Sequence, residues 1–117
     1  VEFHFNISTQ SSIVQRVSLR RGEKMLEFDT LVHWYENRKF LKVQFPLNVH
    51  TNHATYHTPF GYLSRPNHRN TTYDMAKFEV AGHFWADLSE TGFGVALLND
   101  SKYGYACFDN TLVMSLL

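Results

Sequence analysis

The start of the chain alternates apolar and polar residues with a period of two. Val1, Phe3, Phe5 and Ile7 are each separated by one polar residue. Because successive side chains of a β-strand point to opposite faces, this pattern predicts a strand with its two aromatic rings on the same face. Such a strand is expected to be half-buried.

Further segments with strand composition follow, separated by turn-forming residues. The nine predicted strands are 1–7, 13–19, 25–34, 41–45, 54–63, 77–81, 94–98, 103–108 and 112–117. The polar segment 20–24, which contains Gly22, predicts a hairpin. Pro59 and Gly61 within the fifth strand suggest a sheet edge or a bulge. Only segment 34–39 predicts a helical turn, so the fold class is all-β, an antiparallel β-sandwich.

Two polar segments deserve separate predictions. Residues 64–72 form the longest run of turn formers, and a loop of that length is often functional. Residues 85–90 are interpreted as a turn, in which Asp87 and Glu90 are the best local pair of carboxylates. Glycoside hydrolysis needs such a pair, but carboxylates three residues apart in a turn more commonly bond exposed backbone N–H groups.

Composition excludes several classes of partner. The 117 residues are 44% hydrophobic, with eleven Lys and Arg against eleven Asp and Glu. Zero net charge argues against nucleic acid or an anionic membrane. No run of 18 apolar residues occurs, so we expect no membrane-spanning helix, and the first residues lack the features of a signal peptide. The lone Cys107 excludes an intrachain disulfide and fits either a reducing compartment or one whose redox state is of no consequence for this chain.

Both ends of the chain lie inside predicted strands. The first strand begins at Val1, and the apolar segment 112–117 has no polar tail. Ends of natural domains are usually solvated, so we expect a single β-sandwich over 1–117 that is a fragment of a larger protein. The exposed strand edges of such a fragment favour homo-oligomers.

Neither the histidines nor the aromatic residues identify a site by spacing alone. His50, His53 and His57 supply at most two convergent ligands from one strand, fewer than a zinc site needs, and solvent-facing histidines are the simpler interpretation. Four aromatic residues are candidates for stacking on sugar rings, with a core position as the alternative for each. They are Tyr73, Trp85, Tyr103 and Tyr105.

Eight strings of residues carry a resemblance to a known family. They lie at 28–36, 40–46, 54–56, 60–66 (FGYLSRP), 68–71 (HRNT), 77–80, 85–90 (WADLSE) and 94–105. In this order, they resemble the C-terminal region of the class II α-mannosidases, glycoside hydrolase family 38, especially its cytosolic, vacuolar and bacterial branch. The chain departs from that branch at Ser101, where cysteine is common, and at Thr72-Tyr73.

The resemblance implies a parent enzyme of several domains. That enzyme is a retaining, metal-dependent exo-α-mannosidase with a catalytic β/α barrel, a helical bundle and C-terminal β-sandwiches of the galactose-mutarotase-like supersandwich type. Its zinc ligands and aspartate nucleophile lie on the barrel, and no segment here matches them. The resemblance therefore implies no catalytic or metal residue in this chain, and zinc in the parent's catalytic domain. It also implies a cytoplasmic location, or a vacuolar one in a fungal parent.

The same resemblance suggests what this chain contributes. Its partners would be the catalytic barrel, by intramolecular packing, and a mannose-containing oligosaccharide. The loops expected to line the substrate cleft lie at 65–74 and 99–105, with interdomain packing as the alternative role. The residues predicted to contact substrate are Arg65, His68, Arg69, Asp74, Asp100, Lys102 and Tyr103. A second hypothesis, from another class, is an autonomous carbohydrate-binding β-sandwich module.

Overall fold

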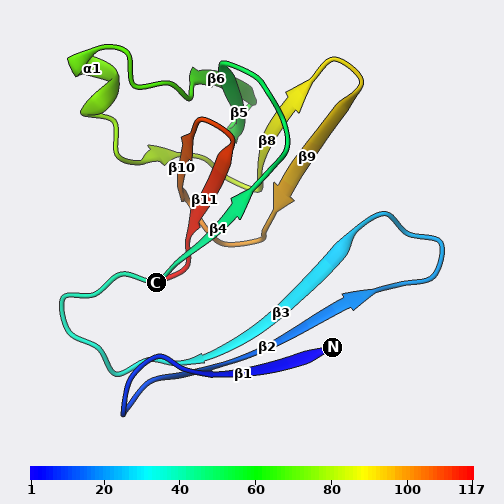
Figure 1. The fold of residues 1–117 in the computed structure, drawn as a ribbon, viewed down its shortest axis with the longest axis vertical. Helices are drawn as coiled ribbons and strands as arrows, with labels where there is room; N and C mark the ends of the chain where they lie inside the picture. Colours follow the sequence, from blue (N-terminus) through cyan, green and yellow to red (C-terminus); the bar gives the residue numbers. More distant parts are fainter. The chain divides into compact units, whose positions relative to one another are not determined.

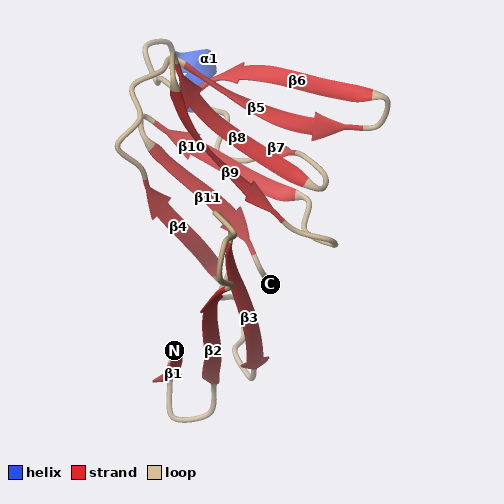
Figure 2. Cartoon of the chain, turned by 90° about the vertical axis from the view of Figure 1, so that its right-hand side faces the viewer, coloured by secondary structure: helices blue, strands red, loops and turns tan.

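The computed structural model describes all 117 residues and contains eleven β-strands and one short helix (Figures 1 and 2). The elements are β1 (Glu2–Asn6), β2 (Ser12–Leu19), β3 (Leu26–His33), β4 (Lys42–Pro46), β5 (His53–Thr58), β6 (Gly61–Pro66), α1 (Thr72–Met75), β7 (Val80–Ala81), β8 (Trp85–Glu90), β9 (Phe93–Leu98), β10 (Gly104–Phe108) and β11 (Thr111–Ser115). Every strand pair is antiparallel, which confirms the predicted fold class. The single helix, α1, has four residues and cannot span a membrane.

The chain divides into two compact units, Val1–Lys39 and Phe40–Leu117. The first is a three-stranded sheet in the order β1-β2-β3. The rings of Phe3 and Phe5 stack with their centroids 6.0 Å apart, so the prediction that they share a face is confirmed. The predicted half-burial is wrong, because every residue of β1 is exposed. A single sheet has no second layer in its own unit to cover the apolar face.

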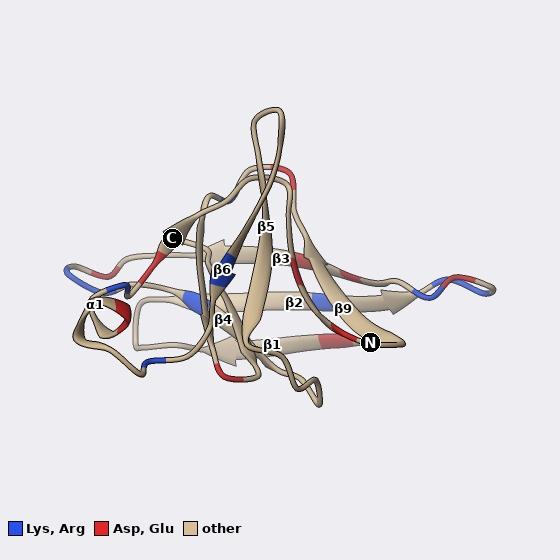
Figure 3. Cartoon of the chain, turned by 90° about the horizontal axis from the view of Figure 1, so that it is seen from above, with Lys and Arg blue, Asp and Glu red and all other residues tan.

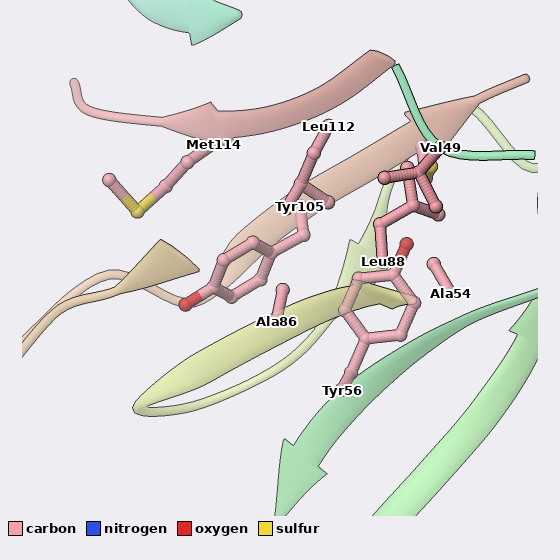
Figure 4. Packing of buried hydrophobic residues seen from close by; sticks show 9 residues of the cluster. Val49, Ala54, Tyr56, Ala86, Leu88, Tyr105, Leu112 and Met114 are labelled. Carbon is pink, nitrogen blue, oxygen red and sulfur yellow. The ribbon is translucent and has the colours of Figure 1, made fainter. Parts of the chain in front are cut away.

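The second unit is a sandwich of two four-stranded sheets. One sheet has the order β4-β11-β10-β7 and the other β6-β5-β8-β9. The core comprises buried side chains from both sheets and the segment between β4 and β5 (Figure 4). Tyr56 of β5 and Tyr105 of β10 meet there, with ring centroids 5.9 Å apart. Apolar burial of this kind is the main force that stabilises the unit.

Gly82 allows the chain to pass close to this aromatic pair. A Cβ atom at Gly82 would lie 2.9 Å from the ring of Tyr105. The Gly82 N–H donates to the carbonyl of Tyr103 at 3.0 Å, so the backbone has little room to retreat. A residue without a side chain is therefore required between β7 and β8.

Three sequence predictions between Phe40 and Leu117 differ from the structure, two in the type of element and one only in its bounds. Segment 54–63 is a hairpin and not one strand, because Pro59 and Phe60 form a two-residue turn in which Phe60 has a φ of 68°. The predicted loop 64–72 begins with the last residues of β6, and its end enters α1. Segment 85–90 is the strand β8, paired on both sides, and not a turn.

The predicted helical turn at 34–39 is also absent. That segment has no regular secondary structure, and Glu36 holds it instead by accepting hydrogen bonds from Ser8, from Ser11 at 2.9 Å and from Lys39 at 2.5 Å. The side-chain hydroxyl of Ser11 also accepts from the Tyr35 N–H at 2.9 Å. These bonds satisfy local polar groups without a helix.

Candidate functional site

Four of the seven residues predicted to contact substrate meet around one hollow of the second unit. Arg65 is on β6, His68 and Arg69 are in the following loop, and Asp74 is in α1. Figure 3 shows a basic position on β6 and an acidic one on α1. The hollow is also lined by Lys77, Glu79, Phe108 and other residues. The polar loop that the sequence singled out is therefore part of a shaped surface.

Asp74 is positioned by the beginning of the helix. The Thr71 hydroxyl donates to the Asp74 carboxylate at 2.6 Å, and the Asp74 N–H donates back to the same hydroxyl oxygen at 3.1 Å. His68 Nδ1 and Lys77 Nζ lie 3.6 Å and 3.7 Å from the carboxylate oxygens. The Thr71 hydrogen bond, assisted by the charges of His68 and Lys77, lowers the pKa of Asp74. Asp74 is thus an ionised acceptor in this hollow.

The two arginines have different roles. Arg65 donates from Nη1 to the Ala81 carbonyl at 2.6 Å, and its guanidinium lies 5.2 Å from the ring centre of Tyr56. These contacts tie β6 to β7 and to β5. Arg69 is exposed and stacks on Phe108, with its guanidinium carbon 3.7 Å from the ring centre. Stacking leaves the N–H donors of Arg69 at the guanidinium edge, where they can bind a ligand oxygen.

The second carboxylate of the hollow is also paired. Glu79 accepts a hydrogen bond from Ser115, and Lys42 Nζ lies 3.0 Å from the same oxygen. These contacts, the Ser115 bond first, lower the pKa of Glu79. A general acid for glycoside cleavage needs a raised pKa, which neither Asp74 nor Glu79 has. The arrangement is suited to hydrogen bonding with a polar ligand and not to proton transfer.

The other three predicted contact residues do not line the hollow. Asp100, Lys102 and Tyr103 belong to the turn between β9 and β10. Lys102 Nζ donates to the Leu116 carbonyl at 2.7 Å, and the Asp100 carboxylate accepts from the Ser101 hydroxyl at 3.0 Å. Tyr103 is exposed, with its ring centre 5.4 Å from that of His83. Lys102 therefore has a structural contact.

No group of three or more His, Cys, Asp or Glu residues is placed to hold a metal ion. The residues present do not fit a zinc site, since one needs three or four convergent ligands. Asp87 and Glu90, interpreted as turn carboxylates, instead lie on the strand β8 at an odd spacing that sends them to opposite faces. Glu90 accepts the His50 N–H at 2.7 Å.

The sequence interpretation missed several residues of the site and misplaced one aromatic. Lys77 and Glu79 line the hollow, and the spacing of Lys77 three residues after Asp74 was a signal that these two side chains meet. Asn67 is buried and joins three loops, for which the sequence offered no signal. Tyr105, a candidate for sugar stacking, is fully buried in the core.

Comparison with known proteins gives consistent matches along the chain. The family model "Glycosyl hydrolases family 38 C-terminal domain" matches residues 1–117. The chain is 51% identical over 115 residues to "Alpha-mannosidase 2C1" of Homo sapiens, covering 98% of this chain and 11% of that protein. It is 44% identical over 110 residues to "Alpha-mannosidase G" of Dictyostelium discoideum, covering 94% of this chain and 10% of that protein. It is 43% identical over 124 residues to "Alpha-mannosidase" of Saccharomyces cerevisiae, covering 100% of this chain and 11% of that protein. The chain thus spans about a tenth of the length of these relatives.

Proposed function

The chain belongs to the C-terminal domain family of the family 38 glycosyl hydrolases, and from this premise we propose that it is part of a retaining exo-α-mannosidase. The enzyme would release terminal α-mannosyl residues from oligosaccharides. The observation that carries this proposal is the 51% to 43% identity to proteins named alpha-mannosidase, which extends over nearly all of the chain.

The reactive groups of the enzyme are proposed to lie outside this chain. In a retaining glycosidase one carboxylate attacks the anomeric carbon, and a second protonates the leaving oxygen and then activates water. The carboxylates of the hollow have lowered pKa values and are held by neighbouring donors, so they are unsuited to protonate the leaving oxygen. We place the nucleophile, the acid and the zinc ion in the catalytic barrel of the parent.

The contribution of this chain is then structural and substrate-binding. We propose that residues 1–117 form a sandwich fragment that supports the barrel and presents the hollow to the substrate cleft. Arg69 offers N–H donors, and Asp74 offers an ionised acceptor for sugar hydroxyls. Expected partners are the barrel and a mannose-containing oligosaccharide, and the expected location is cytoplasmic, or vacuolar in a fungal parent. Self-association through strand edges also stays a prediction.

Kinetic assays of the full-length polypeptide test both the proposed activity and the proposed role of the hollow in substrate binding. With zinc, the polypeptide should hydrolyse p-nitrophenyl α-mannoside and α-mannobiose, and residues 1–117 alone should hydrolyse neither. Arg69→Gln should raise the KM for α-mannobiose about tenfold, because a charged hydrogen bond is lost. Arg21→Gln, which changes an exposed arginine in the other unit, is the matched control. Failure to cleave either substrate would disprove the activity, and an unchanged KM in the Arg69 variant would disprove the cleft role.

A further inference from the structure

The outer face of the β6-β5-β8-β9 sheet, which is turned away from the core, carries a row of large side chains. Directly opposed residues of antiparallel strands share a face. Tyr62 on β6 opposes His57 on β5, and Trp85 on β8 opposes Leu98 on β9. His57 and Trp85 adjoin each other across β5 and β8, with ring centroids 5.8 Å apart. Because these four strands are neighbours in the sheet (Figure 2), one row of large, mostly aromatic side chains crosses all of them.

This aromatic row is accessible and has an additional ring beside it. Tyr62 is 72% exposed and Leu98 60% exposed, and Phe84, itself exposed, lies 5.3 Å from His57 between ring centroids. The Nδ1 atom of His57 is shielded from solvent and has no hydrogen-bond partner. An unsatisfied polar atom in such a position is costly.

A polar row runs alongside the aromatic row on the same face. Ser64 opposes Thr55, and Thr55 opposes Asp87. The only side-chain partner of the Asp87 carboxylate is the hydroxyl of Ser89, at 2.9 Å, and no cation is paired with it. The hydroxyl groups of Thr55 and Ser64 have no hydrogen-bond partner in the chain. Hydroxyls and a carboxylate without a cationic partner thus border a row of rings.

We propose that this outer face is a sugar-binding surface that takes a pyranose ring of a neutral oligosaccharide. A pyranose has C–H groups on its faces and hydroxyl groups around its edge. The rings of Tyr62 and Trp85 would pack on the C–H face, while Asp87, Thr55 and Ser64 would bond the hydroxyls. Apolar rings with a few polar groups of fixed direction are typical of small-ligand sites. The choice of mannose as the sugar rests on the proposed function.

The polar row also decides against an apolar protein surface as the occupant. Such a cover would bury the Asp87 carboxylate with a single hydroxyl partner, and an unpaired buried charge is strongly unfavourable. The first unit offers a contrast, because one face of its sheet is almost entirely apolar. There, Phe5 opposes Ile13, and Ile13 opposes Val32. That face suits protein packing, and the outer face with Asp87 suits a ligand rich in hydroxyls.

The backbone around the aromatic row is held rigidly. The His83 N–H donates to the His57 carbonyl at 2.9 Å, and the Asn99 amide and the Tyr105 hydroxyl both donate to the His83 carbonyl, at 3.1 Å and 2.6 Å. The Asn99 N–H donates to the Phe84 carbonyl at 2.9 Å. A surface fixed in this way loses little conformational entropy when it binds.

Hydrogen exchange of the full-length polypeptide tests the proposal locally. α-Mannotriose should slow exchange in peptides from 53–66 and 85–90, whereas sorbitol, which has hydroxyls but no ring, should not. Asp87→Asn should weaken the mannotriose effect about tenfold, since it removes a charged acceptor at nearly constant shape. Tyr62→Ala should weaken it as well. Tyr35→Ala is the matched control, because Tyr35 is 69% exposed but lies in the other unit.

The hydrogen-exchange results decide whether the outer face binds sugar. Protection of these peptides by mannotriose, weakened in the Asp87 and Tyr62 variants and retained in the Tyr35 variant, would support the proposal. Unchanged exchange would overturn it, as would equal protection by sorbitol or strong protection of the face without any sugar. Turnover of p-nitrophenyl α-mannoside by the same samples reports on the proposed enzymatic function separately, so the two can fail independently.

Discussion

The two units of the chain use similar strands and reach different degrees of burial. The sandwich from Phe40 to Leu117 encloses Leu88 and Tyr105 completely. The sheet from Val1 to Lys39 leaves Phe5 and Leu26 about half exposed, although its strands pair in regular register. Strand pairing alone therefore does not make a core. A second layer must cover the apolar face before burial can stabilise the strands.

The largest expected effect compares the same substitution in both units. Leu88→Ala should destabilise the sandwich by roughly 2 to 5 kcal/mol, because Leu88 is fully buried and its truncation leaves a cavity. Leu26→Ala should cost about 0.5 kcal/mol, because Leu26 is 54% exposed. Native-state hydrogen exchange measures both, in peptides from β8 and from β3. Equal costs would show that something else covers the first sheet.

A smaller effect is expected at the polar contacts that hold loops of the sandwich. Asn67 is buried and donates from its amide to the carbonyls of Thr51 at 2.9 Å and Asp109 at 2.5 Å. Asn67→Ala should cost about 2 kcal/mol, because it removes both hydrogen bonds of a buried amide. His68→Ala, one residue later and partly exposed, should cost under about 0.5 kcal/mol. Thermal denaturation compares the two variants, and similar melting points would contradict this role for Asn67.

The smallest effect on stability is expected at Glu36, the charged residue that holds a loop of the first unit as Asn67 holds loops of the sandwich. The hydrogen bond from Lys39, with those from Ser8 and Ser11, lowers the pKa of Glu36 from 4.5 to about 2. A lowered pKa means that the folded state resists protonation. The stabilisation is therefore present above about pH 4.5 and is lost as the pH falls towards 2. Asn67 has no titratable group, so its contacts should not change over this range.

Carbon-13 NMR of the Glu36 carboxyl group measures this titration directly. Lys39→Met should move the Glu36 pKa towards its ordinary value, because it removes the largest cause of the shift. Lys24→Met, in the turn of the β2–β3 hairpin, is the control. A Glu36 carboxyl that titrates at its ordinary pKa in the unchanged chain would refute the proposed contact.

Alternation and turn residues were sufficient to predict most strands and their antiparallel pairing. They failed where local composition misleads. Segment 85–90 contains Asp87, Ser89 and Glu90, which favour turns, yet tertiary pairing makes it an inner strand of the sheet because Ala86 and Leu88 alternate into the core. Propensity is a weak guide when two neighbouring strands supply hydrogen bonds. The exposure of β1 was also beyond local patterns, since burial depends on what lies opposite.

Only the local part of the candidate site could be predicted, because sequence patterns do not show which distant residues come into contact. The loop that contains His68 and Arg69 was identified by its turn residues, and α1 brings Asp74 back towards it. The contacts of Arg69 with Phe108 and of Glu79 with Ser115 join residues far apart in sequence, so no spacing rule reveals them. The outer face likewise depends on register across four strands, which places Tyr62, His57 and Trp85 in one row.

The core between the two sheets includes Cys107, the only cysteine of the chain. Burial raises the pKa of this thiol to about 11, so at neutral pH it is both protonated and shielded. Only the thiolate reacts readily with alkylating reagents. The rate at which a maleimide labels Cys107 therefore measures how often the sandwich opens. The native cysteine thus reports unfolding of this unit without an engineered labelling site.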